Sequence, residues 1–177
     1  MEGLLLVVLV LLVAQGVMGG IDTLLNHELI ARLPQRPDAR TEIGLHVLRE
    51  AIWAALFAGL AWFAWHGAAA LLIAAIVAAE IVITACDEFV ENRTRVLPQN
   101  ERVLHVFLTL NVGAIIALLV PLLLAWGREP SAVVAQSHGI LSWILSAIAL
   151  AAATWSMRDL AAWRRLRRAT VARKERG

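Results

Sequence analysis

Four long stretches of this 177-residue chain contain no Asp, Glu, Lys or Arg, and they constrain its fold more than any other feature. A run of about 20 apolar residues can cross the ~30 Å hydrocarbon core of a bilayer as a helix. Hydrophobic residues make up 60% of the chain and charged ones 17%. We therefore predict an integral membrane protein, which excludes a soluble enzyme, a disulfide scaffold and a β-barrel of short alternating strands. The charge-free stretches are residues 3–21, 51–79, 103–127 and 130–157.

The sequence predicts an all-α protein with five transmembrane helices. One membrane domain covers residues 1–157, and a basic cytoplasmic tail covers residues 158–177. The first apolar run lacks the basic start of a signal peptide, so we expect it to remain as a helix. The pairs Leu33-Pro34 and Leu97-Pro98 mark helix ends, because proline has no backbone N–H and clashes with the preceding turn. The predicted helices are residues 3–32, 38–66, 69–93, 99–126 and 139–165.

Positive charge is concentrated on one side of the predicted membrane. Arginines follow the first and third helices and fill the tail, whereas the opposite side carries only Arg128. Cytoplasmic loops carry an excess of Lys and Arg, so we expect the N-terminus outside and the C-terminus in the cytoplasm, in a bacterial inner membrane. The tail has no nucleic-acid motif, and membrane lipid is its expected partner. The basic residues are Arg32, Arg36, Arg40, Arg93, Arg95, Arg102, Arg158, Arg164, Arg165, Arg167, Arg168, Arg173, Lys174 and Arg176.

Polar residues inside the apolar helices follow a repeated spacing. Three of them in the third helix lie at i, i+7 and i+11, which places them on one narrow stripe at 100° per residue. The first helix repeats this spacing with three polar residues of its own. The residues are Glu80, Asp87 and Glu91 in the third helix, and Gln15, Asp22 and Asn26 in the first.

The repeat continues beyond each Leu-Pro pair. A glutamate there is followed four residues later by a histidine, a spacing that puts both side chains on one helix face. The pairs are Glu42 with His46 and Glu101 with His105. We infer two parallel repeats, residues 3–66 and 69–126. Their two helical hairpins are expected to form a four-helix bundle about a pseudo-two-fold axis, with the fifth helix outside it.

Ionisable side chains are costly inside a membrane and usually mark function. Many carboxylates at one end of a bundle repel one another unless they are protonated or bound to cations. The sequence shows no adjacent run of arginines to neutralise them, so a pair of divalent metals is the expected solution. Carboxylate and imidazole ligands suit iron, or alternatively manganese. The predicted metal ligands are Asp22, Glu42, His46, Asp87, Glu91, Glu101 and His105.

The layout of these residues, over about residues 15–110, resembles that of ferritin-like di-iron carboxylate proteins. Those proteins place a carboxylate on each of two helices and a Glu-x-x-His pair on each of the other two. The chain is similar in this layout of ligands to the membrane-bound alternative oxidases and the ubiquinone-ring hydroxylases. The resemblance implies two irons as cofactor. Both pairs here are Glu-x-x-x-His, which departs from the family pattern and leaves open which groups bridge the metals.

A structural alternative exists for every carboxylate, because each one can pair with an arginine such as Arg49, Arg93 or Arg95 at the membrane interface. His27 and Glu28 point about 100° or more away from the stripe of the first helix and are expected in an outer shell. Glu80 lies about 10 Å deeper than Asp87 and suits a proton path, a substrate contact or a structural role. The residues expected to orient ligands or move protons are Asn26, His27, Glu28, Arg49, Glu50 and Glu80.

The leading hypothesis is a di-metal oxidoreductase that acts on a lipid-soluble substrate, such as a quinol or a lipid, at the cytoplasmic face. The alternatives are an ion- or proton-coupled transporter and a non-catalytic subunit of a membrane complex. A haem held by His46 and His105 is a further option, but it leaves the carboxylates unexplained. A protein partner or a homo-oligomer is compatible with each of these. The sequence does not identify catalytic residues.

Overall fold

The computed structural model describes residues 1–174 of the chain and is helical almost throughout. Five helical segments in this part are long and apolar enough to cross a membrane, in agreement with the predicted number. Residues 175–177 of the expected tail lie outside the described residues. The helices are α1 (Glu2–Ile21), continued by the π-helix η1 (Asp22–Ile30), then α2 (Arg40–Trp62), α3 (Ala68–Thr94), α4 (Gln99–Trp126) and α5 (Ile140–Lys174).

The two Leu-Pro pairs lie in the breaks between helices, as the sequence predicts. The first belongs to a 3₁₀ turn, η2 (Leu33–Gln35), and a second turn, η3 (Pro37–Ala39), leads into α2. The chain enters η2 through Arg32, which has a φ of 50°. Pro98 directly precedes α4 in an extended conformation, with a ψ of 153°. Both breaks therefore place the Glu/His pairs in the first two turns of a new helix.

The second helix ends four residues earlier than predicted. Residues 63–66, expected to be helical, form strand β1 (Phe63–His66), which pairs antiparallel with β2 (Ala132–Ala135). The register joins Phe63 to Ala135 and His66 to Ala132. This ribbon satisfies the backbone hydrogen bonds of two connections that leave the helices at the same end of the molecule. The ribbon ties the α2–α3 connection to the α4–α5 connection.

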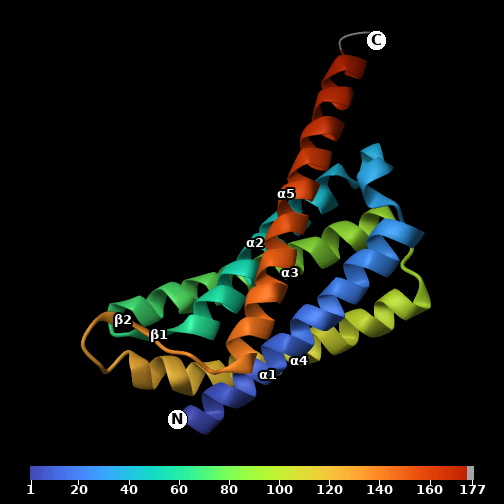
Figure 1. The fold of residues 1–177 in the computed structure, drawn as a ribbon. Helices are drawn as coiled ribbons and strands as arrows, with labels where there is room; N and C mark the ends of the chain where they lie inside the picture. Colours follow the sequence, from blue (N-terminus) through green and yellow to red (C-terminus); the bar gives the residue numbers. More distant parts are fainter. Residues whose placement is uncertain (175–177) are drawn as a thin grey trace.

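Helix α5 lies along α2, which is the most extensive packing between any two described elements. The next most extensive contacts join α1 to α4 and α2 to α3. Figure 1 shows the N-terminus and the C-terminal end of α5 at opposite ends of the molecule, with α5 extending beyond the other helices. The apolar core between the helices includes the fully buried Leu9, Leu12, Leu60, Leu119 and Leu145.

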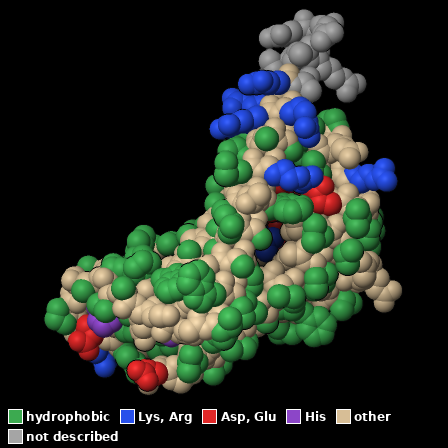
Figure 2. Space-filling model, viewed as in Figure 1, with side chains coloured by type: hydrophobic (Ala, Val, Ile, Leu, Met, Phe, Trp, Pro, Cys, Tyr) green, Lys and Arg blue, Asp and Glu red, His purple; other side chains and the backbone are tan. Residues whose placement is uncertain are grey.

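Large apolar side chains also cover much of the outer surface. Leu71 and Leu150 expose 71% and 70% of their surface, and Figure 2 shows hydrophobic side chains spread along the helices. In water such a surface would favour aggregation, whereas lipid tails solvate it. Arginine side chains gather toward the C-terminal end of α5, away from this apolar zone (Figure 2). The distribution agrees with a membrane protein.

Gly67 provides a test of how the ribbon is built. Its φ of +57° suits glycine, and a Cβ at this position would lie 2.6 Å from the backbone nitrogen and Cα of Ser131. Gly67→Ala should therefore lower the free energy of unfolding by about 2 kcal/mol or more, measured by thermal denaturation in detergent. Gly113→Ala is the control, because a Cβ there meets nothing within 4 Å. Equal stability of both variants would contradict this account of the turn.

Candidate metal centre

The π-helix η1 determines which side chains of the first segment meet the rest of the molecule. Its last hydrogen bond joins the Ala31 N–H to the Asn26 carbonyl over 2.8 Å, an i→i+5 pattern. Each residue of a π-helix turns by less than the 100° of an α-helix, so side chains five apart share a face. Asp22 and His27 are such a pair, and His27 Nε2 lies 3.5 Å from Asp22 Oδ2. The expectation that His27 points away from the stripe is wrong for this reason.

The first group of potential ligands joins η1 to α4. Asp22, His27, Glu101 and His105 each offer one ligand atom, and these four atoms lie within 4.8 Å of one another. His105 Nε2 lies 3.2 Å from Asp22 Oδ2, and His27 Nε2 lies 3.6 Å from Glu101 Oε1. The first three of the four are buried and His105 is half-buried. Two carboxylates and two imidazoles at this spacing could hold a metal ion.

A second group lies beside the first and shares His105. His105 Nδ1 lies 3.2 Å from Glu88 Oε1 and 3.5 Å from Glu91 Oε2, both on α3. These three residues form the other group that could hold a metal among the residues that the structure describes. Glu88 was not predicted, because it lies off the i, i+7, i+11 stripe. Its signal in the sequence is the spacing of three residues to Glu91.

Arg95 lies at the centre of the predicted ligand set. Its guanidinium donates to Glu42 Oε1 over 3.1 Å and to both oxygens of Glu101 over 2.5 and 2.8 Å, and it also bonds Glu91. Burial acts to lower the pKa of Arg95, but the bonds to Glu101 and the charges of Glu42 and Glu91 raise it above its ordinary value. The sequence has no run of arginines beside these carboxylates, but this single arginine partly neutralises them, as the structural alternative anticipates. Three of the predicted ligands share one internal cation.

A second arginine, Arg49 on α2, pairs with acidic side chains of α3. Its Nη1 donates to Asp87 Oδ2 over 2.7 Å, and His46 Nε2 lies 3.3 Å from the same oxygen. The rings of His46 and His27 stack with centroids 4.4 Å apart and planes within 6°. Glu42, His46 and Asp87 therefore lie next to the first group of ligands without belonging to either group.

Glu80 lies deeper along α3, as predicted, and it is only 2% exposed. One of its oxygens accepts hydrogen bonds of 2.9 Å from Trp53 Nε1 and from Thr84 Oγ1. Arg49 Nε lies 3.6 Å from that oxygen, so Glu80 connects through Arg49 to Asp87. Glu80 is therefore held in place by Trp53 and Thr84, and Arg49 links it to Asp87.

Of the remaining predicted residues, Asn26 contacts a potential ligand, whereas Glu28 and Glu50 lie away from the two groups. Asn26 donates to Asp22 Oδ1 over 2.7 Å and accepts from Asn100 over 2.9 Å, which orients the Asp22 carboxylate from behind. Glu28 turns instead toward α5, where Arg158 donates to it over 2.5 Å. Glu50 lines a cavity beside the histidines, and its Oε2 has no hydrogen-bond partner.

Acidic side chains outnumber basic ones in this polar cluster. We use that name for the seven carboxylates with the three histidines and two arginines that contact them. Even with every histidine protonated, the carboxylates would exceed the cations by two charges. Such an excess in a low-dielectric environment requires bound protons or additional cations. The members are Asp22, Glu42, Glu80, Asp87, Glu88, Glu91, Glu101, His27, His46, His105, Arg49 and Arg95.

No protein family, curated protein or solved structure matches this chain. The chemistry of the polar cluster and of its surroundings therefore has to support any functional argument.

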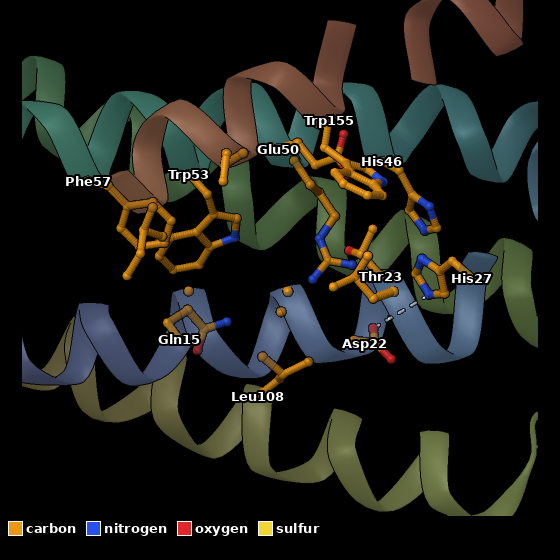
Figure 3. A pocket seen from close by; sticks show the side chains of 18 residues that line it. Gln15, Asp22, Thr23, His27, His46, Glu50, Trp53, Phe57, Leu108 and Trp155 are labelled. Atoms are coloured by element: carbon orange, nitrogen blue, oxygen red, sulfur yellow. Dashed lines mark ion pairs between the residues drawn. The ribbon is translucent and has the colours of Figure 1, made fainter. Parts of the chain in front are cut away.

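A cavity of about 250 Å³ adjoins the polar cluster. Asp22, His27 and His46 line one part of it, and apolar side chains such as Trp53 and Phe57 line the other (Figure 3). Ligand sites in proteins are typically concave and mostly apolar, with a few polar groups that fix orientation. The polar cluster is therefore accessible to a small molecule from this cavity.

The role of Arg95 can be tested by removing its charge. Arg95→Met should destabilise the protein by about 3–5 kcal/mol at neutral pH, because three buried carboxylates lose their shared cation. The loss should shrink as the pH falls, since protonated carboxyl groups no longer need a cation. Thermal denaturation in detergent across a pH series measures both effects.

The matched control is Arg128→Met, which removes an exposed arginine. A loss of stability for Arg95→Met that does not depend on pH would contradict the electrostatic explanation.

Proposed function

We propose that this chain is a membrane-embedded oxidoreductase with a two-metal carboxylate centre, most suitably of iron, that acts on a lipid-soluble substrate. One observation carries the proposal: two adjacent groups of carboxylate and histidine side chains share His105. A substrate-sized cavity reaches this site. Manganese is the alternative metal, because it accepts the same ligands.

The charge of the polar cluster supports bound cations. Its carboxylates outnumber its cationic groups, and His27 Nε2, although buried, has no hydrogen-bond partner between Asp22 and Glu101. Glu42 Oε2 and Asp87 Oδ1 are also buried without hydrogen-bond partners. Free lone pairs on buried carboxylate and imidazole groups are the ligands that a divalent metal would use.

We assign the primary metal position to Asp22, His27, Glu101 and His105, and the second to the neighbouring Glu88 and Glu91. Asn26 would hold the Asp22 carboxylate in orientation, as hydrogen-bonded neighbours do for metal ligands. Arg95 competes with the metals for Glu91 and Glu101, so metal binding requires it to release at least one of them. Bound iron would supply the redox chemistry.

Matched contacts between the repeats support the proposed pseudo-two-fold bundle. His46 of the first repeat contacts Asp87 of the second, and His105 of the second contacts Asp22 of the first, at 3.3 and 3.2 Å. Glu42 and Glu101, which precede these histidines by four residues, both bond Arg95. Equivalent residues therefore make equivalent contacts across the centre, as two related hairpins would.

Metal analysis tests the proposed centre directly. Purified protein should contain about two irons or manganeses per chain, and His105→Ala should lose most of them because both groups use His105. His66→Ala is the matched control, since His66 lies in β1 and stacks on Trp126 far from the polar cluster. Elemental analysis and absorption spectra of all three proteins provide the measurement. Metal-free wild type, or equal metal in both variants, would reject the centre.

Proton or ion transport is the second candidate, and the buried position of Glu80 favours it. Glu80 connects through Arg49 and Asp87 to His46, so a line of polar groups runs from the apolar core to the polar cluster. A transporter should lose flux in reconstituted vesicles when Glu80 is replaced by Gln. An oxidoreductase should retain its metal in the same variant.

We also propose that the N-terminus lies outside and the C-terminus in the cytoplasm of a bacterial inner membrane. The basic end of α5 and the polar cluster would then share the cytoplasmic side, because cytoplasmic segments carry excess positive charge. A C-terminal green fluorescent protein should fluoresce, and a C-terminal alkaline phosphatase should be inactive. Active phosphatase at that end would reverse the proposed orientation.

A further inference from the structure

The cavity beside the polar cluster lies between α1, α2 and α5, within the predicted membrane spans. Its apolar part is lined by Trp53, Phe57, Leu108 and Ile148. Figure 3 shows Phe57 and Trp53 toward one end and His46, His27 and Asp22 toward the other. The cavity is therefore amphipathic along its length, with the polar cluster closing one end.

Small residues leave room for a ligand to enter from the lipid side. At Gly16 the helices are close, because a Cβ there would lie 2.4 Å from Ile148 Cγ2. One turn further on, a Cβ at Gly19 or Gly20 would meet nothing within 4 Å. Both glycines line the cavity, and Gly20 is exposed. The space next to α1 thus widens toward the polar cluster, at a depth where the surrounding medium is lipid.

Two polar atoms in the cavity wall lack partners. Trp155 Nε1 is a donor and Glu50 Oε2 belongs to a carboxyl group, and both are buried without a hydrogen bond. Figure 3 places the two side chains on the same side of the cavity. A buried polar group without a partner is destabilising, so a ligand that satisfies both gains affinity. A hydroxyl group can do so, because it donates and accepts.

The charges around this position select the head group. Asp22 and Glu50 would repel an anionic head, and a quaternary ammonium head has neither a proton to donate to Glu50 nor a lone pair to accept the N–H of Trp155. Arg49 is already engaged by Asp87 and Glu80, so it is not a free partner for a carboxylate or a phosphate. An uncharged head with a hydroxyl group avoids the repulsion and can still donate and accept a hydrogen bond.

We propose that this cavity binds an uncharged amphiphile, with its hydroxyl-bearing head between Glu50 and Trp155 and its apolar body directed past Gly19 toward the lipid. The identification of this amphiphile as the substrate class rests on the proposed function. Binding itself requires no metal and no redox step, so it can be tested separately.

The test uses three probes of equal chain length on the full protein in lipid nanodiscs. These are 4-decylphenol, 4-decylbenzoate and 4-decylphenyltrimethylammonium, which share the ring and the alkyl chain, and their affinities are measured by titration calorimetry. The phenol should bind saturably at one per chain and at least tenfold more tightly than either charged probe. Equal uptake of all three would indicate simple partitioning into lipid and would overturn the proposal, as would preference for a charged head.

Two variants locate the bound phenol. Gly19→Leu should weaken its binding at least tenfold by filling the cavity, whereas Gly113→Leu should not, although both positions have open space around them. Trp155→Phe keeps an aromatic side chain and removes the N–H donor, so it should weaken binding several-fold. Unchanged affinity in Gly19→Leu would overturn the proposed location.

Metal content separates this inference from the proposed function. Gly19→Leu should contain as much metal as the wild type, because a Cβ at Gly19 meets no proposed ligand within 4 Å and its contact with Asp22 is through the backbone, not the carboxylate. Phenol binding by a protein that holds no metal would support the cavity and reject the oxidoreductase. A metal-loaded protein that does not bind the phenol would support the metal centre and overturn the proposed binding cavity.

Discussion

Burial of acidic side chains is the constraint on which the rest of the structure depends. Helix packing in a membrane gains little from the hydrophobic effect, because lipid tails are as apolar as leucine. The polar contacts between helices therefore determine how the helices are placed. Arg95 joins carboxylates from α2, α3 and α4, and Arg49 joins α2 to α3. These two guanidinium groups hold together the ends of α2, α3 and α4, and Asp22 and His27 of η1 join them through His105 and Glu101.

Local backbone geometry then decides which side chains reach that region. The π-helix brings His27 onto the face of Asp22, next to the His46 ring with which it stacks. A π-helical segment is a rare, less stable form of helix that often occurs at functional sites. Here it adds an imidazole to a group that an unbroken α-helix would leave with three members. The group of four potential ligands thus depends on the π-helical hydrogen bonding of η1 as well as on its charges.

Much of this arrangement follows from sequence patterns, and the parts that do not have identifiable causes. The charge-free stretches predict the five helices, and the i, i+4 pairs place Glu42 with His46 and Glu101 with His105. The outward position expected of His27 is wrong because η1 turns by less than 100° per residue. Arg95 is one of several arginines that the sequence offers as partners for these carboxylates, and periodicity does not single it out, because it lies just after the end of α3. The ribbon of β1 and β2 depends on pairing between segments about 70 residues apart, which no local pattern encodes.

The ribbon has a mechanical consequence for the whole molecule. It fastens two helix connections at the end of the bundle opposite the polar cluster, through the pairing of residues 63–66 with residues 132–135. Helices whose connections are fixed to each other at one end can change their spacing mainly by moving apart at the other end. The freedom to move is therefore concentrated around the carboxylates and histidines, where a shift of a fraction of an ångström would alter how well these groups could hold a cation.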